Sequence, residues 1–308
     1  MRTKNNALPG HVAMLVANML WGLMAPVSKD TLNFFAENGI SPIVLPALRI
    51  IGATIAFWTL SFILQHEHTT RRDKRSLFFA GMFSIAFNQC LFIVGISFTS
   101  PIDASVVTTM LPIVTMIMAA LVLKEPLTQL KAVGVMVGMS GALLLVLGDG
   151  AGLHIDKDHI IGDAMCFTAQ VSFACYLVFF KNLINRYSGV TLMKWMFLFS
   201  LIVSLPFTLP YLMAVPWSEV PLKVYSEICY TVFVATFMSF LLITVGQKRL
   251  RPTVVSMYNY IQPVMSTTIS LIWGVATFGI TKGIAIALVF AGVYVVTQSK
   301  KRIEQSNG

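Results

Sequence analysis

Two stripes of small polar residues, each containing a proline, are the features of this sequence best suited to binding a small molecule. Within each stripe the spacing is i, i+3, i+4, i+7 and i+10, which places the residues along one face of a helix. The stripes are Ser105, Thr108, Thr109, Pro112 and Thr115, and then Ser256, Asn259, Tyr260, Pro263 and Ser266. Hydroxyl and amide groups could bond a polar ligand, whereas each proline removes a backbone N–H and kinks its helix. The alternative is that both stripes only help helices to pack.

Further amides and aromatic rings lie one helical turn apart, an arrangement that can enclose a small ligand. Asn18 precedes Trp21, Gln170 precedes Tyr176, and a third apolar segment carries Ser84, Asn88 and Gln89. The predicted cavity residues are Asn18, Trp21, Arg49, Asn88, Gln89, Thr108, Thr109, Gln170, Tyr176, Tyr258, Asn259 and Gln262, and the predicted hinges are Pro112 and Pro263. Each ring could instead pack in the core or lie in an interfacial aromatic belt, and each amide could bond between helices.

Arg49 has three interpretations. Counted from Ile43, it lies roughly 9 Å below the outer end of its helix, at about 1.5 Å per residue. Its guanidinium could snorkel to the headgroups, or pair with Asp103 or Glu37 at the outer surface. It could also face a ligand, since its forked donors match a carboxylate or phosphate.

Other kinds of chemistry leave no trace in the sequence. It has no GxxxxGK[ST] loop for ATP, and no Asp, Glu or His in the middle of an apolar segment for a proton relay. The four cysteines, Cys90, Cys166, Cys175 and Cys229, lack metal-ligand spacing and fit packing roles. His66-Glu67-His68 lacks the i, i+4 pair of a helical metal site. We therefore expect neither a metal nor a cofactor.

The elements that position these residues are membrane-spanning helices. The mean hydropathy is +0.77 and only 11% of the residues are charged, which excludes an ordinary soluble domain. Apolar segments long enough to cross a hydrocarbon layer of roughly 30 Å repeat along the chain. They predict an all-α membrane protein with ten transmembrane helices, at about 11–33, 43–65, 76–98, 103–123, 130–148, 159–181, 191–213, 225–247, 253–275 and 281–298.

The chain is a duplication. Adding 151 to the first stripe gives the second, and the same offset relates Lys131 to Lys282 and Gly141 to Gly292. An offset of 152 relates Asn18 to Gln170. We expect two repeats, 10–148 and 159–298, joined by a connector at 149–158. Because each repeat has an odd number of spans, the second enters the membrane in the opposite sense, as in many transporters.

The net charge of +9 is explained by sidedness rather than by nucleic acid. Most lysines and arginines fall on the side of the N-terminus, so both termini are expected in the cytoplasm of a cell whose inner membrane holds the protein. The longest inner loop is expected at His66–Arg75. Gly134, Gly138 and Gly141 form a small-residue seam, either within the chain or between protomers of a homo-oligomer.

The chain carries an ordered set of short motifs: Trp21-Gly22 with Lys29, Arg49, the stretch 104–112, and Lys124-Glu125-Pro126 followed by Gly134 and Gly141. On these residues the chain resembles the EamA branch of the drug/metabolite transporter superfamily. The second copy departs from it, because Ala276 occupies the position of Glu125 and no basic residue near Ser200 matches Arg49. The resemblance implies a ten-helix inner-membrane carrier, usually an exporter of amino acids or other small metabolites.

These observations favour a secondary transporter that exports small organic metabolites by alternating access, with the lipid bilayer and a small-molecule substrate as its partners. Two other classes remain at this stage. A polytopic membrane enzyme for lipid-linked substrates would need a nucleophile, an acid–base pair or a metal cluster at the membrane edge, and the sequence offers none. A scaffold without transport activity would tolerate changes of its polar residues.

Overall fold

The computed structural model of the chain describes residues 7–64, 67–98, 106–147, 157–272 and 279–299, and every regular element in these ranges is a helix. Six helical stretches are long and apolar enough to cross a membrane: Val44–Ile63, Gln129–Leu147, Ile160–Phe179, Gly189–Met213, Leu222–Arg249 and Ile280–Gln298. Two shorter apolar helices, Leu8–Met24 and Val106–Val122, accompany them. The predicted all-helical membrane fold is confirmed.

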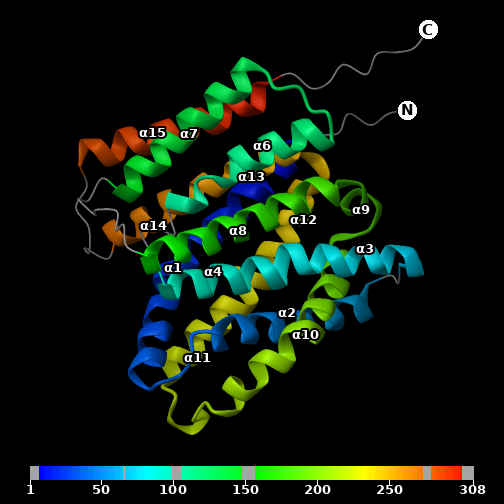
Figure 1. Cartoon of the computed structure of the whole chain (residues 1–308), viewed down its shortest axis with the longest axis vertical. Coiled ribbons are helices and arrows are strands. Elements are labelled where there is room, and N and C mark those ends of the chain that lie inside the picture. Colours follow the sequence, from blue (N-terminus) through cyan, green and yellow to red (C-terminus); the bar gives the residue numbers. More distant parts are fainter. Residues whose placement is uncertain (1–6, 65–66, 99–105, 148–156, 273–278, 300–308) are drawn as a thin grey trace.

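The helices follow the predicted order along both halves of the chain (Figure 1). The first half holds α1 (Leu8–Glu37), α2 (Val44–Ile63), α3 (Arg71–Gly81), η1 (Met82–Ala86), α4 (Phe87–Phe98), α6 (Leu111–Val122) and α7 (Gln129–Leu147). The second holds α8 (Lys157–Phe179), α9 (Lys181–Arg186), α10 (Gly189–Met213), η2 (Trp217–Glu219), α11 (Leu222–Cys229), η3 (Tyr230–Met238), α12 (Ser239–Arg249), α13 (Pro252–Met257), η4 (Tyr258–Tyr260), α14 (Ile261–Ile272) and α15 (Ile280–Gln298).

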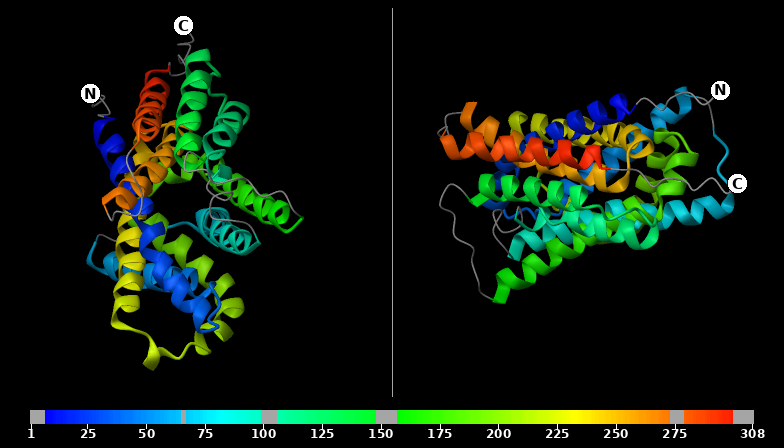
Figure 2. Two further views of the ribbon diagram at one scale, coloured as in Figure 1. Left: turned by 90° about the vertical axis from the view of Figure 1, so that its left-hand side faces the viewer. Right: turned by 90° about the horizontal axis from the view of Figure 1, so that it is seen from above.

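Helix contacts follow the sequence duplication. The last helices of the two halves, α7 and α15, lie side by side, and so do the second spans, α2 and α10 (Figures 1 and 2). The pair α1 and α12 has its counterpart in α8 and α4, and the pair α1 and α14 has its counterpart in α8 and α6. Each half therefore packs its first span against two spans of the other half, so neither half is a separate globular unit.

The small-residue seam lies inside one chain, between α7 and α15. Gly292 faces the α7 backbone so closely that an added Cβ would lie 2.4 Å from the nitrogen of Gly138. On the other side of the crossing, a Cβ on Gly141 would lie 2.7 Å from the carbonyl oxygen of Ala285. The offset of 151 relates Gly141 to Gly292 and Gly134 to Ala285, so the contacts on the two sides of the crossing follow the pseudo-twofold symmetry of the repeats.

Both halves contain a π-helical segment in the third span, η1 in one and η3 in the other. The i→i+5 pattern frees backbone carbonyls, and such segments often lie at functional sites. The Ser172 hydroxyl donates to the carbonyl of Phe83 in η1 at 2.7 Å. The Trp21 indole N–H donates to the carbonyl of Ala235 in η3 at 2.8 Å. Phe83 and Ala235 are themselves related by the offset of 152, so the two halves use equivalent carbonyls.

The expected loop at His66–Arg75 is too long, because α3 begins at Arg71. Thr70 caps this helix, with its hydroxyl accepting the backbone N–H of Asp73 at 3.1 Å. The basic run therefore forms the first turn of a helix instead of a loop. The apolar pattern begins only at Leu77, which is why hydropathy places the span too late.

Several features named from the sequence lie outside the described residues. They are His66, Asp103, Ser105, Ala276, the connector 149–156, the segment from Lys300, and the side chains of Lys29 and Ser266.

The orientation of the termini remains a prediction, and labelling tests it. Cysteines at position 68 and after Lys300 should react only with reagents that reach the cytoplasm, since basic segments stay inside. A cysteine replacing the exposed Asn38, in the turn between α1 and α2, should react from outside. The background should lack Cys229, which is exposed. Labelling of position 68 in intact cells by an impermeant reagent would show that the orientation is opposite to the predicted one.

Candidate functional site

Three of the predicted cavity residues form one amide cluster between α1 and the η4–α14 segment, in which Asn18 is buried and Asn259 and Gln262 are partly buried. Gln262 donates from its amide nitrogen to the side-chain oxygen of Asn18 at 3.0 Å and to that of Asn259 at 3.3 Å. The Asn18 side chain has no exposed surface, and its amide nitrogen donates to the carbonyl of Met14 at 2.8 Å. In the described part of the chain, the amide nitrogen of Asn259 and the amide oxygen of Gln262 make no hydrogen bond. These two groups can bond a ligand.

The two polar stripes meet next to this cluster. The Tyr260 hydroxyl donates to the carbonyl oxygen of Thr109 at 3.0 Å, and the two residues are related by the offset of 151. Both helices are broken there: residues 109–110 form a turn before α6, and η4 is a 3-10 segment before α14. Pro112 and Pro263 follow these breaks, so the prolines lie beside interruptions of the helix rather than in continuous kinked helices. Thr108 takes part in a polar interaction as well.

Trp21 and Arg49 both contact η3. The indole of Trp21 bonds to Ala235, as described above, and Arg49 Nε donates to the hydroxyl of the next residue, Thr236, at 2.9 Å. Thr236 in turn donates to the carbonyl of Thr231 at 2.7 Å. Among the described residues no carboxylate lies within 4.0 Å of the Arg49 guanidinium, and Glu37 is exposed at the end of α1. The expected pairing with Glu37 is therefore absent, and Asp103 is outside the described residues.

Four predicted cavity residues lie on α4 and α8, and two of them join helices in this conformation. Asn88 donates to the carbonyl of Ala169 at 2.9 Å and joins α4 to α8. The buried Tyr176 hydroxyl donates to Gln247 at 2.9 Å and joins α8 to α12. Gln170 and Gln89 are 6% and 7% exposed, and neither amide atom of Gln89 has a hydrogen-bond partner among the described residues. The structure does not bring these four residues into the Asn18 cluster.

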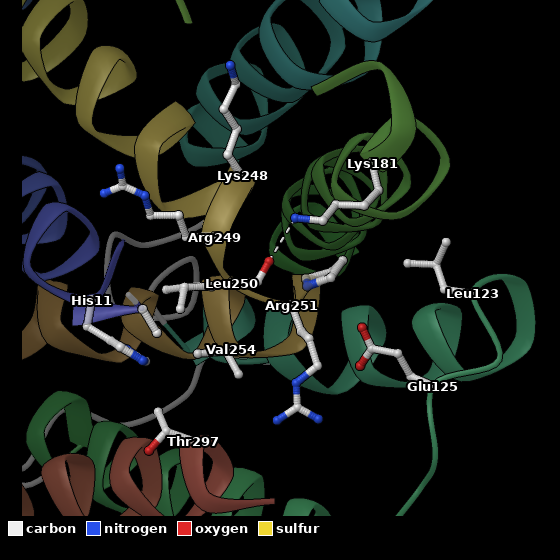
Figure 3. Close-up of a pocket in the computed structure, with 12 residues that line it drawn as sticks. His11, Leu123, Glu125, Lys181, Lys248, Arg249, Leu250, Arg251, Val254 and Thr297 are labelled. Atoms are coloured by element: carbon white, nitrogen blue, oxygen red, sulfur yellow. Dashed lines mark hydrogen bonds between the residues drawn. The ribbon is translucent and has the colours of Figure 1, made fainter. Parts of the chain in front are cut away.

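A pocket that the sequence analysis did not identify opens at the end of the bundle that carries both termini (Figure 3). Its volume is about 370 Å³. Its walls come from the start of α1, the α6–α7 connection, α9, the α12–α13 turn and the end of α15. The polar and charged lining consists chiefly of His11, Glu125, Lys181, Lys248, Arg249 and Arg251. One residue of the pocket could have been found from the sequence, because His11 lies two helical turns before Asn18 on the same face of α1.

Backbone carbonyls hold two of the cations in this pocket. Lys181 donates from Nζ to the carbonyl of Leu250 at 2.8 Å and to that of Gln247, at the end of α12. Burial lowers the pKa of Lys181 to about 8, and the charge of Glu125 opposes part of that shift, so the ammonium is mostly protonated at neutral pH. Arg251 donates from Nη2 to the carbonyl of Ser299 at 2.9 Å.

Glu125, the carboxylate among the described lining residues, is already paired. Glu125 accepts from the ammonium of Lys131 at 2.8 Å and from the hydroxyl of Thr253 at 3.2 Å. Lys131 is fully buried, so this ion pair neutralises its charge. Lys124 precedes Glu125 with a φ of +53°, and the N–H of Glu125 closes the end of α6 on the carbonyl of Ala119. The turn thus fixes the carboxylate at the pocket wall.

The comparisons with known proteins point to one family. A model described as the EamA-like transporter family matches residues 8–147 and 160–298. An uncharacterized transporter of Bacillus subtilis, YyaM, is 25% identical over 265 residues, which cover 86% of each chain. An uncharacterized transporter of Archaeoglobus fulgidus is 25% identical over 181 residues, 59% of this chain and 60% of that one.

Plant relatives match a smaller part of the chain. Protein WALLS ARE THIN 1 of Arabidopsis thaliana is 27% identical over 159 residues, 49% of this chain and 40% of that one. The match therefore spans less than two thirds of the archaeal and the plant relative. A solved structure, titled only as the crystal structure of a protein, superposes with a TM-score of 0.77 at 17% identity and covers 94% of this chain and 96% of its own. That likeness supports the fold alone.

Proposed function

The chain belongs to the EamA-like transporter family, and from this we propose that it is a secondary transporter that exports a small organic metabolite across the cytoplasmic membrane by alternating access. A multi-pass membrane transporter implies a small-molecule substrate. Because the family consists of transporters, the alternative of an enzyme for lipid-linked substrates is dropped. The metabolite and the direction of transport belong to the proposal.

The observation that carries the proposal is the amide cluster of Asn18, Asn259 and Gln262. Polar side chains buried within a span are costly in a membrane and usually face a substrate path. The cluster lies where η4 interrupts the helix, and irregular backbone at membrane depth is a recurring feature of transporter substrate sites. The donor of Asn259 and the acceptor of Gln262 that remain unused fit a small polar metabolite.

The inverted symmetry of the helix contacts supports alternating access. In one half Trp21 of α1 bonds to η3, and in the other Ser172 of α8 bonds to η1. If each first span moves with its π-helical partner, the two halves can exchange roles between inward-open and outward-open states. Trp21 would then help to couple the amide cluster to this movement, since it lies one turn beyond Asn18 on α1.

Substitutions in the cluster test the proposal. The substrate is first identified as a metabolite whose levels inside and outside the cell differ between cells with and without the protein. Gln262→Leu and Asn259→Leu should each lower its transport by up to about tenfold, because a hydrogen bond lost to the ligand is worth about 0.5–1.5 kcal/mol. Asn18→Leu should lower transport as well, because it removes the acceptor that positions Gln262. Thr108→Val should impair transport as well.

The matched control is Asn38→Leu, which changes an exposed asparagine after the end of the same helix, α1. Its transport should equal that of the original protein. All variants should remain abundant and helical, as measured by size-exclusion chromatography and circular dichroism. Wild-type transport by all three cluster variants would reduce the cluster to helix packing and remove the basis of the proposal.

A further inference from the structure

The charges of the pocket at the terminus-bearing end of the bundle are unbalanced. Lys181, Lys248, Arg249 and Arg251 line it, and Glu125 is the acidic residue among the lining side chains. Since Glu125 is paired with Lys131, it offsets only part of the charge of the other cations. Within the described residues, no carboxylate lies within 4.0 Å of Lys181, Lys248 or Arg249.

We infer that this pocket binds the carboxylate or phosphate group of an organic anion, and that the transported metabolite belongs to this class. The inference rests on the proposed transport function and names the substrate chemistry that the sequence left open. A concave site lined by charges of one sign raises the local concentration of the opposite charge. Guanidinium and ammonium groups are also the side chains that bond carboxylates and phosphates most strongly.

The way in which the cations are held strengthens the inference. A lysine fixed by a carboxylate has its charge neutralised, whereas a lysine fixed by backbone carbonyls keeps its charge for a ligand. Lys181 is held by the carbonyls of Gln247 and Leu250, and Arg251 bonds to the carbonyl of Ser299. Figure 3 shows Lys181 directed at the Leu250 carbonyl, with Lys248 and Arg249 projecting from the last turn of α12. Lys181 is thus preorganised without losing its charge.

The pocket also leads toward the amide cluster. His11 lines the pocket, and its Nδ1 lies 2.8 Å from the hydroxyl of Tyr258, the residue before Asn259. Asn18 is seven residues further along α1, roughly 10 Å deeper at about 1.5 Å per residue. The volume of about 370 Å³ is within the range of roughly 300–1,000 Å³ that small-molecule sites occupy. An anion bound in the pocket would therefore lie roughly 10 Å from the amides of Asn18 and Gln262.

Two sources could supply such an anion: a soluble metabolite, or the phosphate of an anionic lipid, since basic pockets between helices also bind lipid headgroups. The inference commits to the soluble metabolite, because His11 in the pocket wall contacts Tyr258 beside the amide cluster inside the bundle. The experiment uses the purified full-length protein in discs of phosphatidylcholine, with succinate and inorganic phosphate as probes. Binding is measured by calorimetry at low ionic strength.

The main variant is Lys248→Gln combined with Arg249→Gln. Neither side chain makes a hydrogen bond to another described residue, so the substitutions should leave the fold intact. A second variant, Arg251→Lys, keeps the positive charge but removes the paired N–H donors of the guanidinium. The matched control is Arg75→Gln, an exposed arginine in the first turns of α3 and outside the pocket. The double variant should weaken the binding of at least one probe by about tenfold or more, and the control should leave its Kd unchanged.

Equal Kd values for the double variant and the control, or no binding of either probe to the original protein, would overturn the inference. A second arm measures the same variants in discs that contain phosphatidylglycerol. Loss of lipid binding without loss of probe binding would assign the pocket to lipid and also refute the inference. The proposed transport function is judged separately, by metabolite export in cells that carry the Asn18→Leu and Gln262→Leu variants.

Discussion

Replacing Gly292 with alanine is expected to remove most of the folded protein from the membrane. The new Cβ would lie 2.4 Å from the nitrogen of Gly138, 2.5 Å from its Cα and 2.7 Å from the carbonyl oxygen of Gly134. All three are backbone atoms of α7, so no side-chain rotation relieves the overlap, and α15 must move as a whole. We expect a cost of about 3 kcal/mol, the upper part of the range for overpacked sites. Thermal unfolding of the solubilised protein and its abundance in membranes measure this.

The control is Gly279→Ala, at the N-cap of the same helix. No heavy atom lies within 4 Å of an added Cβ there, and the backbone is extended, so alanine fits without strain. This variant should match the original protein in unfolding temperature and abundance. If Gly292→Ala were equally stable, α7 and α15 could not be packed as closely as the structure has them, and the pseudo-twofold crossing would be wrong.

The duplication made this part of the fold predictable. The offset of 151 relates Gly141 to Gly292, so the two halves should make equivalent contacts. The structure has them at the crossing of α7 and α15, where Gly141 meets α15 and Gly292 meets α7, and Tyr260 bonds to its own counterpart, Thr109. Hydropathy located the spans because segments that face lipid are apolar. It missed the start of α3 at Arg71, because that polar first turn is stabilised by the Thr70 cap and not by apolar residues.

The site was predictable only in part, because its members are chosen by tertiary contacts. Asn18, Asn259 and Gln262 were expected in one cavity and do lie together, whereas Asn88 and Tyr176 bond across helix interfaces. The π-helical segments were not predicted, since apolar residues at α and π spacing give the same hydropathy. The basic pocket was missed because its walls come from five separate segments, and because lysines and arginines on this side already serve to orient the chain.

Arg49 is where the structure changes a sequence-based interpretation most. Its bond to Thr236 ties α2 to η3, the segment that also binds Trp21. The neutral hydroxyl leaves the guanidinium charge in place, and the other nitrogens have no hydrogen bond to the described residues. A charge held within a span without a carboxylate is costly unless water or an anion faces it. This favours a role for Arg49 in binding an anionic group.

Arg49→Lys is accordingly expected to lower transport by about 10- to 100-fold at normal abundance. Lysine keeps the charge but loses the fork, and hydrogen bonds to charged groups are worth about 1.5–3 kcal/mol each. Arg49→Gln should lower transport at least as far, because it removes the charge as well. The measurement is the initial rate of metabolite transport per amount of protein, and Arg72→Lys, an exposed arginine of α3, is the control.

Thr236→Val separates binding from positioning. It removes the hydroxyl that Arg49 bonds and keeps the size of the side chain, so the guanidinium stays charged but is less well placed. If Arg49 binds the ligand, Thr236→Val should cause a smaller loss of transport than Arg49→Lys, mainly through a higher KM. A structural role predicts equal losses in both, together with low abundance of Arg49→Gln. Unchanged transport in both Arg49 variants would mean that the side chain only reaches toward the headgroups, and the ligand hypothesis for this residue would fail.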